Sequence, residues 1–342
     1  MIMLPNVKQS SQEAIDFMEK TKIAKLCLVV PCYNEESILR DSAHKMAEKL
    51  TELKELNIID RYSSVLLVND GSQDQTWKII SQLHQEAPQT FMGLKLSANR
   101  GHQNALLAGL LEARQLADVT ISLDADLQDD LDAINEFMSE YYRGSDIVYG
   151  VRSDRSSDSF LKRFTAESFY KFMHHLGVKT IYNHADFRLM SRRALDALAQ
   201  YKEVNLYLRG LIPLLGYRQS IVLYQRKSTD RPTHYTLGKM LLLAWDGITS
   251  FSVRPIRLIS ILGGVALFWM LILILKVLYD KFFGNTVAGW TSLSIIVLLF
   301  SGMQLLAIGV IGEYIAKTYM EVKRRPRFNI EEKLTGEENE EN

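Results

Sequence analysis

Short apolar runs alternate with amphipathic stretches between Lys25 and about Tyr235, and this alternation most narrows the folds open to the chain. Helices are predicted over amphipathic stretches such as 36–56 and 75–86. A β-α-β-α order implies a mostly parallel sheet with helices on both faces, and ligands bind such sheets at the carboxyl ends of the strands. Five runs bounded by turn residues are predicted strands: 26–31, 64–70, 91–97, 119–126 and 146–152.

Composition sets broad limits on the function. The chain has 342 residues, enough for one large domain plus an appendage, and 47% of them are apolar. Forty basic residues balance forty acidic ones, so the total charge gives no case for a nucleic-acid partner. Cys27 and Cys32 show no disulfide framework and no metal-binding spacing. Residues 1–21 are polar, and we expect an N-terminal arm without a cleaved signal peptide.

Two long uncharged stretches follow the alternating region, at 258–275 and 282–312. Each can cross a hydrocarbon core of about 30 Å at about 1.5 Å per residue. We therefore expect a transmembrane helical hairpin over 258–313, against the alternative of two buried core helices. Residues 236–257 are amphipathic, which predicts juxtamembrane helices at the membrane interface.

Basic residues flank the hairpin on its outer ends and set its orientation. Arg254 and Arg257 precede the first stretch, and five basic residues between 317 and 327 follow the second. The positive-inside rule then places the large domain in the cytoplasm. Residues 314–342 form a basic and then acidic cytoplasmic tail, whose acidic end we expect to be disordered.

Three polar motifs follow the first three predicted strands. In the first motif (Pro31, Tyr33, Asn34, Glu35), the Asn and Glu side chains offer hydrogen-bond acceptors to a nucleoside. In the second (Asp70, Gly71), Asp70 can accept from a base N–H. Plain strand-to-helix turns would also use these residue types. In the third motif, Gly101 permits close backbone approach, and Arg100 and His102 can face a diphosphate. Asn99 opens this third motif. The alternative for His102 is a residue at a helix N-terminus with no ligand.

The fourth motif is Asp124-Ala125-Asp126, at the end of the strand predicted at 119–126. Alternate residues of a strand share a face, so the two carboxylates can hold one divalent cation. Mg²⁺ and Mn²⁺ prefer oxygen ligands and often bridge a diphosphate to one or two carboxylates. Asp129, Asp130 and Asp132 are expected to form the solvated start of the next helix.

The segments PCYNEE, VNDGS, NRGHQNALLAG and DADLQ, in this order, resemble glycosyltransferase family 2. With the two C-terminal stretches, the resemblance covers about residues 22–325 and extends to the polyprenyl-phosphate glycosyltransferases. It implies an α/β GT-A domain, Rossmann-like with a mostly parallel sheet, over 22–235. It also implies a multi-pass protein of the bacterial inner membrane whose catalytic domain is cytoplasmic. Relatives of this type often self-associate, so a homo-oligomer is one expected form.

The resemblance also implies roles for matching residues. Asp124 and Asp126 would bind Mg²⁺ or Mn²⁺ on the donor diphosphate. Asp186 and Arg188 would lie near the sugar and the acceptor, with a cap on a helix at 191–199 as the alternative for Asp186. The nucleotide sugar would be bound by Pro31, Tyr33, Asn34, Glu35, Asp70, Gly71, Asn99, Arg100, Gly101, His102, Asp124, Ala125 and Gln128.

The implied reaction moves a sugar from UDP-glucose or another UDP-hexose onto undecaprenyl phosphate with inversion. A phosphate monoester has a second pKa of about 6, so the acceptor is a nucleophile without a strong base. Catalytic residues would be Asp126, Asp186 and Arg188. Candidates for the acceptor phosphate are Arg152, Arg155, Arg226 and Arg231. Two alternatives stay open: a transferase acting on a hydroxyl acceptor, and a non-catalytic, membrane-tethered subunit that binds nucleotide sugars.

Overall fold

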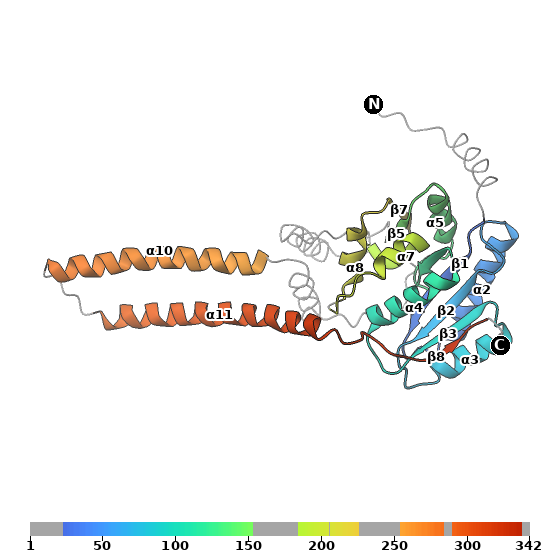
Figure 1. The fold of residues 1–342 in the computed structure, drawn as a ribbon, viewed down its shortest axis with the longest axis horizontal. Coiled ribbons are helices and arrows are strands. Elements are labelled where there is room, and N and C mark those ends of the chain that lie inside the picture. Colours follow the sequence, from blue (N-terminus) through green and yellow to red (C-terminus); the bar gives the residue numbers. More distant parts are fainter. Residues whose placement is uncertain (1–22, 153–183, 205, 226–253, 284–288, 337–342) are drawn as a thin grey trace, which may run out of the picture. The chain divides into compact units, whose positions relative to one another are not determined.

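The protein is described here from a computed structural model that covers residues 23–152, 184–204, 206–225, 254–283 and 289–336 (Figure 1). The chain forms two compact units. The first comprises residues 1–166, 181–233 and 326–342, and the second comprises residues 167–180 and 234–325. The predicted arm at 1–21 and nearly all of the predicted interface helices at 236–257 lie outside the described residues.

Within the described residues, the first unit contains an eight-stranded sheet in the order β7-β5-β6-β4-β1-β2-β3-β8. Strand β1 lies near its middle and is buried along its whole length. The strands are β1 (Leu26–Cys32), β2 (Ser64–Asn69), β3 (Phe91–Leu96), β4 (Val119–Ser122), β5 (Ile147–Arg152), β6 (His184–Ser191), β7 (Gln219–Tyr224) and β8 (Ile330–Leu334).

The sheet is mixed, which corrects the expectation of a mostly parallel one. Strands β1 to β4 are parallel to one another, as the β-α alternation predicts, and β7 is parallel to β5. Strand β6 runs antiparallel between β4 and β5, and β8 runs antiparallel along β3. The last three strands were not predicted, because no β-α-β spacing leads into them.

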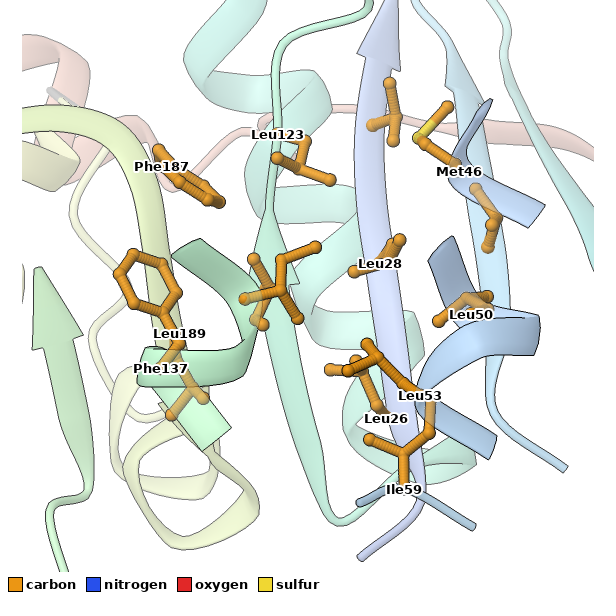
Figure 2. Packing of buried hydrophobic residues seen from close by; sticks show 14 of the residues in the cluster. Leu26, Leu28, Met46, Leu50, Leu53, Ile59, Leu123, Phe137, Phe187 and Leu189 are labelled. Atoms are coloured by element: carbon orange, nitrogen blue, oxygen red, sulfur yellow. The ribbon is translucent and has the colours of Figure 1, made fainter. Parts of the chain in front are cut away.

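Helices cover both faces of the sheet, as predicted. Leu26 and Leu28 of β1 point to one face and pack with Met46, Leu50 and Leu53 of α2, all fully buried (Figure 2). Burying each such side chain contributes about 1.5–3 kcal/mol. The helices of this unit are α2 (Leu39–Glu55), α3 (Thr76–Glu86), α4 (His102–Leu116), α5 (Ala133–Tyr142), α7 (Arg192–Leu198) and α8 (Leu208–Leu211), with a 3-10 turn η1 (Ile212–Leu215).

Helix α4 packs on the opposite face, and a glycine permits its close approach. A Cβ on Gly109 would lie 2.5 Å from Cγ1 of Val29 and 2.7 Å from Cγ2 of Val68. Real Cβ atoms do not come this close, so a side chain here would push the helix away from β1 and β2. The N-terminus of α4, which carries His102, is thereby held beside the ends of these strands.

The acidic tail is partly ordered, which corrects the expectation of a disordered segment. Residues 330–334 form β8 along the edge strand β3. Glu331 accepts from Lys95 at 2.9 Å, and Glu332 accepts from the Trp77 indole N–H at 3.2 Å. Leu334 packs against the hydrophobic core. The composition of the tail predicted disorder because it cannot reveal these partners, which lie more than two hundred residues away along the chain.

The second unit contains two long helices, α10 (Arg254–Phe282) and α11 (Trp290–Lys323). The first predicted span, 258–275, lies within α10, and the second, 282–312, overlaps α11. Among the described residues, one segment, Leu299–Lys323, is long and apolar enough to cross a membrane, with a mean hydropathy of 1.5.

Candidate active site

A cleft of about 340 Å³ lies at the carboxyl ends of β1, β2 and β4, where the four sequence motifs meet. This volume falls in the range of small-molecule sites. The convergence follows from topology, because parallel neighbours end at the same edge of the sheet. The cleft is lined by Pro31, Cys32, Tyr33, Glu35, Asp70, Asn99, Gly101, His102, Ala105, Asp124, Ala125 and Asp126.

The first two motifs brace each other through side-chain to backbone hydrogen bonds. Asn34, with a φ of 55°, accepts from the Gln73 N–H through Oδ1 at 2.9 Å. The Asn34 N–H in turn donates to the hydroxyl of Ser72 at 3.0 Å. The Glu35 N–H donates to Thr76 Oγ1 at 2.9 Å. Asn34 is therefore placed to shape the loop, and it does not line the cleft.

Position 71 requires a glycine for both conformational and steric reasons. Its φ is 62°, and a Cβ at this position would lie 2.4 Å from the Asn99 backbone nitrogen. A non-glycine residue would thus be strained and would also collide with the third motif. The loop after β2 and the loop after β3 are in direct backbone contact here.

Asp70 binds the backbone of the third motif. Its side chain is buried, and its two oxygens accept from the Arg100 N–H at 2.7 Å and from the Gly101 N–H at 2.9 Å. Burial raises the pKa of Asp70 above its ordinary value, although these two bonds favour the carboxylate. The structure thus shows Asp70 ordering the loop that carries Asn99 and Gly101 into the cleft.

Asp124 and Asp126 line the cleft together, directly after β4. Burial, together with the nearby carboxylates of Asp129, Asp186 and Asp126, raises the pKa of Asp124 to about 6 against the opposing effect of His102. The Gln128 N–H donates to Asp126 Oδ1 at 3.3 Å.

These residues fit a divalent cation. Asp124 and Asp126 supply the oxygen donors that such a cation prefers, and two carboxylates are the usual protein share of a Mg²⁺ or Mn²⁺ site on a diphosphate. Within the described part of the chain, no group of three or more His, Cys, Asp or Glu side chains is arranged to hold a metal ion. The remaining ligands would then have to come from a bound phosphate or from water.

Asp186 lies in β6 and is held by three cationic or titratable side chains. Arg209 binds its two carboxylate oxygens through Nε at 3.1 Å and Nη2 at 3.0 Å. Arg188 donates from Nη2 at 3.0 Å, and His102 Nε2 lies 3.4 Å from Oδ2. Burial would raise the pKa of Asp186, but His102 and the two arginines outweigh it and hold the pKa well below the usual range.

One alternative from the sequence is wrong, and the other stays a prediction. Asp186 does not cap the helix at 191–199, because Ser191 accepts from the Ala194 N–H at the start of α7. His102 does begin a helix, but its ring also faces Asp186 and Asp124, whose carboxylate oxygens lie 3.4 and 3.8 Å from Nε2. Burial lowers the pKa of His102, yet these carboxylates raise it on balance.

The predicted and missed arginines occupy different settings. Arg188 is 1% exposed and forms an ion pair with Asp186. Its guanidinium carbon lies 6.0 Å from the centre of the Tyr149 ring. Arg209 was not singled out, because the apolar residues around it carry no motif. Only the packing of α8 brings it to Asp186. Arg152 ends β5, while Arg155, Arg226 and Arg231 lie outside the described residues.

Asp129 is buried, which corrects its assignment to a solvated helix start. Its side chain accepts from the hydroxyl of Tyr224 at 2.6 Å. Asp132 is exposed as expected and accepts from Lys49 at 2.8 Å. The burial of Asp129 could not be predicted, because the three aspartates share one polar stretch and Tyr224 lies 95 residues away.

Comparison with known proteins adds independent information. The family described as glycosyl transferase family 2 matches residues 27–199. "Uncharacterized glycosyltransferase YkoT" of Bacillus subtilis (strain 168) is 47% identical over 92% of this chain and 93% of the relative. "Prophage bactoprenol glucosyl transferase homolog" of Escherichia coli (strain K12) is 37% identical over 90% of this chain and 98% of the relative. "Bactoprenol glucosyl transferase" of Shigella phage SfV is also 37% identical, with the same coverage.

Proposed function

The chain belongs to glycosyl transferase family 2 and is a glycosyltransferase, and from this premise we propose that it transfers a hexose from a UDP-sugar to undecaprenyl phosphate. UDP-glucose is the proposed donor, because relatives similar over nearly their whole length are named bactoprenol glucosyl transferases. The product is a lipid-linked sugar at the bacterial inner membrane, available for cell-envelope glycan modification. Inversion at the anomeric carbon follows from a single in-line displacement.

One observation carries the proposal: two adjacent carboxylates line the same cleft as residues from three other strand-end motifs. In this proposal Asp124 and Asp126 hold Mg²⁺ or Mn²⁺, which neutralises charge on the departing diphosphate when bound. Tyr33 and Glu35, which line the same cleft, are proposed to face the nucleoside. The loop at Asn99 and Gly101, held by Asp70, offers backbone groups to the donor.

The state of Asp186 favours a phosphate acceptor over a hydroxyl acceptor. A general base works best with a pKa near the operating pH, whereas the pKa of Asp186 is held well below its usual range. An alcohol would need such a base, but a phosphate dianion would not. Asp186 is therefore proposed to order Arg209 and His102 beside the sugar rather than to remove a proton.

The acceptor must bring a second anionic group close to the donor. At an effective dielectric of about 20, two unit charges about 4 Å apart repel by about 4 kcal/mol. Arg152, Arg155, Arg226 and Arg231 are the residues proposed to offset this repulsion. The first of them ends β5, next to Tyr224.

Membrane attachment completes the proposal. Leu299–Lys323 is long and apolar enough to span, and we propose that α10 and α11 form a two-helix transmembrane hairpin with the catalytic unit in the cytoplasm. A lipid acceptor stays in the bilayer, so an anchored enzyme meets it at a high effective concentration. Self-association in the membrane belongs to the same proposal.

The test uses the full-length protein in lipid vesicles with undecaprenyl phosphate, a panel of UDP- and GDP-sugars, and either Mg²⁺ or Mn²⁺. Mass spectrometry of the lipid fraction should show one hexosyl phosphate lipid, and Asp126→Asn should abolish it. Asp130→Asn serves as the control, because it removes a carboxylate nearby that does not line the cleft. Transfer to diacylglycerol instead, or transfer by Asp126→Asn at the wild-type rate, would refute the proposal.

A further inference from the structure

We infer that Tyr224 is a positioning residue that holds the metal-binding loop in place through Asp129, an inference that rests on the proposed function. Tyr224 ends β7, whereas Asp129 follows the Asp124-Ala125-Asp126 motif. Tyr224, Asp129 and Arg152 are called the tyrosine clamp below. The role of the clamp is to fix where Asp126 and Gln128 point when the donor binds.

The bond at the centre of the clamp is short and shielded from water. The Tyr224 hydroxyl donates to Asp129 Oδ1 at 2.6 Å, and both side chains are 3% exposed. A hydrogen bond to a buried carboxylate is among the stronger ones in proteins, since water cannot compete for either partner. Arg152 adds a further contact, because its Nε donates to the Tyr224 oxygen at 3.3 Å.

The loop that the clamp holds has a backbone that needs support. Leu127 has a φ of 47°, in the left-handed region that side chains other than glycine, asparagine and aspartate rarely adopt. Two hydrogen bonds turn the chain here, from the Leu127 N–H to the Asp124 carbonyl at 3.2 Å and from the Gln128 N–H to Asp126 Oδ1 at 3.3 Å. Such a conformation persists only when its surroundings impose it. Asp129 supplies the next anchor along the chain.

Tyr224 can serve as an anchor because its own ring is fixed. The ring packs edge-on against Phe187 with 5.2 Å between ring centres. Gly150 of β5 makes room for both rings, since a Cβ there would lie 3.0 Å from Cε1 of Tyr224 and 3.0 Å from Cδ1 of Phe187. Strand β7 is also hydrogen-bonded to β5 along its length, so the hydroxyl has little freedom to move.

The clamp connects two parts of the reaction. One end is the loop that carries Gln128 and Asp126, and the proposed function assigns Asp126 to the cation on the donor. The other end is Arg152, which it assigns to the acceptor phosphate. The clamp therefore sets the position of the donor's cation relative to an acceptor-binding arginine. Removing the Tyr224 hydroxyl should loosen the metal-binding loop without changing a residue that lines the cleft.

The experiment compares Tyr224→Phe with wild type in the full-length protein. Binding of Mn²⁺ in the presence of UDP is followed by the electron paramagnetic resonance signal of free Mn²⁺. Loss of one hydrogen bond should weaken Mn²⁺ binding by about fivefold. The Mn²⁺ concentration for half-maximal sugar transfer should rise by the same factor.

Tyr142→Phe is the matched control. Its buried hydroxyl donates to the Ile58 carbonyl at 2.7 Å and accepts from the Ala24 N–H, away from the metal-binding loop. This variant should lower the melting temperature about as much as Tyr224→Phe and leave Mn²⁺ binding unchanged. If both variants leave Mn²⁺ binding unchanged, or both weaken it equally, the inference is overturned and Tyr224 is merely structural.

Asp129 provides a second pair of variants should Tyr224→Phe fail to fold. Asp129→Asn keeps an oxygen that can accept from Tyr224, so it should bind Mn²⁺ more tightly than Asp129→Ala, which lacks the same charge near Asp124 but has no acceptor. Asp129→Ala should show the full loss, and equal affinities for the two variants would overturn the inference. If wild type binds Mn²⁺ with UDP but transfers no sugar to undecaprenyl phosphate, the proposed function fails while the clamp is still tested.

Discussion

Replacing Asp186 with asparagine should destabilise the catalytic unit, because it removes the carboxylate that compensates a buried guanidinium. Arg188 is 1% exposed and donates to Asp186 at 3.0 Å, while Asp186 itself is 14% exposed. Breaking a buried ion pair by removing one partner typically costs about 3–5 kcal/mol. At about 2–4 °C per kcal/mol for a domain of this size, the melting temperature should fall by roughly 6 to 20 °C.

The comparison variant is Arg209→Gln, which removes the other arginine bound to the same carboxylate. The Arg209 side chain is 43% exposed, so water already screens its pair with Asp186. Exposed ion pairs contribute about 0.2–1 kcal/mol, and the melting temperature should fall by no more than about 4 °C. Differential scanning fluorimetry of the purified protein measures both values. Equal losses for the two variants would refute the argument that burial of Arg188 decides the cost.

The same Asp186→Asn protein tests the chemistry. If the acceptor is a phosphate, transfer measured well below the lowered melting temperature should be reduced but detectable, because no base is required. Complete loss of turnover in a folded variant would instead point to a hydroxyl acceptor and to Asp186 as its base.

Two further predictions concern acid stability and the C-terminal strand. Because the folded-state pKa of Asp186 is lowered, its stabilisation is complete above the unfolded value of about 3.9 and is lost as the pH falls through the folded value. The difference in melting temperature between wild type and Asp186→Asn should therefore shrink below about pH 4. It should also decrease from pH 5 towards pH 8, because Asp186 raises the pKa of His102 and its pairing with protonated His102 is lost as that proton leaves. A difference that grows below pH 4 would contradict this. Deleting residues 328–342 removes β8 and the hydrogen bond from the Ser97 N–H to the Asn329 carbonyl. The melting temperature should therefore drop by about 5 °C or more, and KM for the nucleotide sugar should rise. Deleting only 337–342 is the control, and equal melting temperatures for the two deletions would show that β8 contributes nothing.

The cleft could be located from the sequence because its parts follow from strand direction. Strands β1 to β4 are parallel, so Pro31, Asp70, Asn99 and Asp124 had to end at one edge once the strands were recognised. Local patterns carried this information: an apolar run, a turn residue and then a polar motif. The residues that line the cleft include ten of those assigned to it in advance.

The sequence by itself thus determined the α/β core, the edge where the motifs meet and the apolar stretches beyond it. The tertiary structure alone decided the antiparallel strands β6 and β8, the pairing of Arg209 with Asp186 and the burial of Asp129 against Tyr224. The physical reason is the range of the interactions. Periodicity and turn chemistry act over a few residues, whereas each of these contacts joins groups from different strands or helices, and burial then sets their strength.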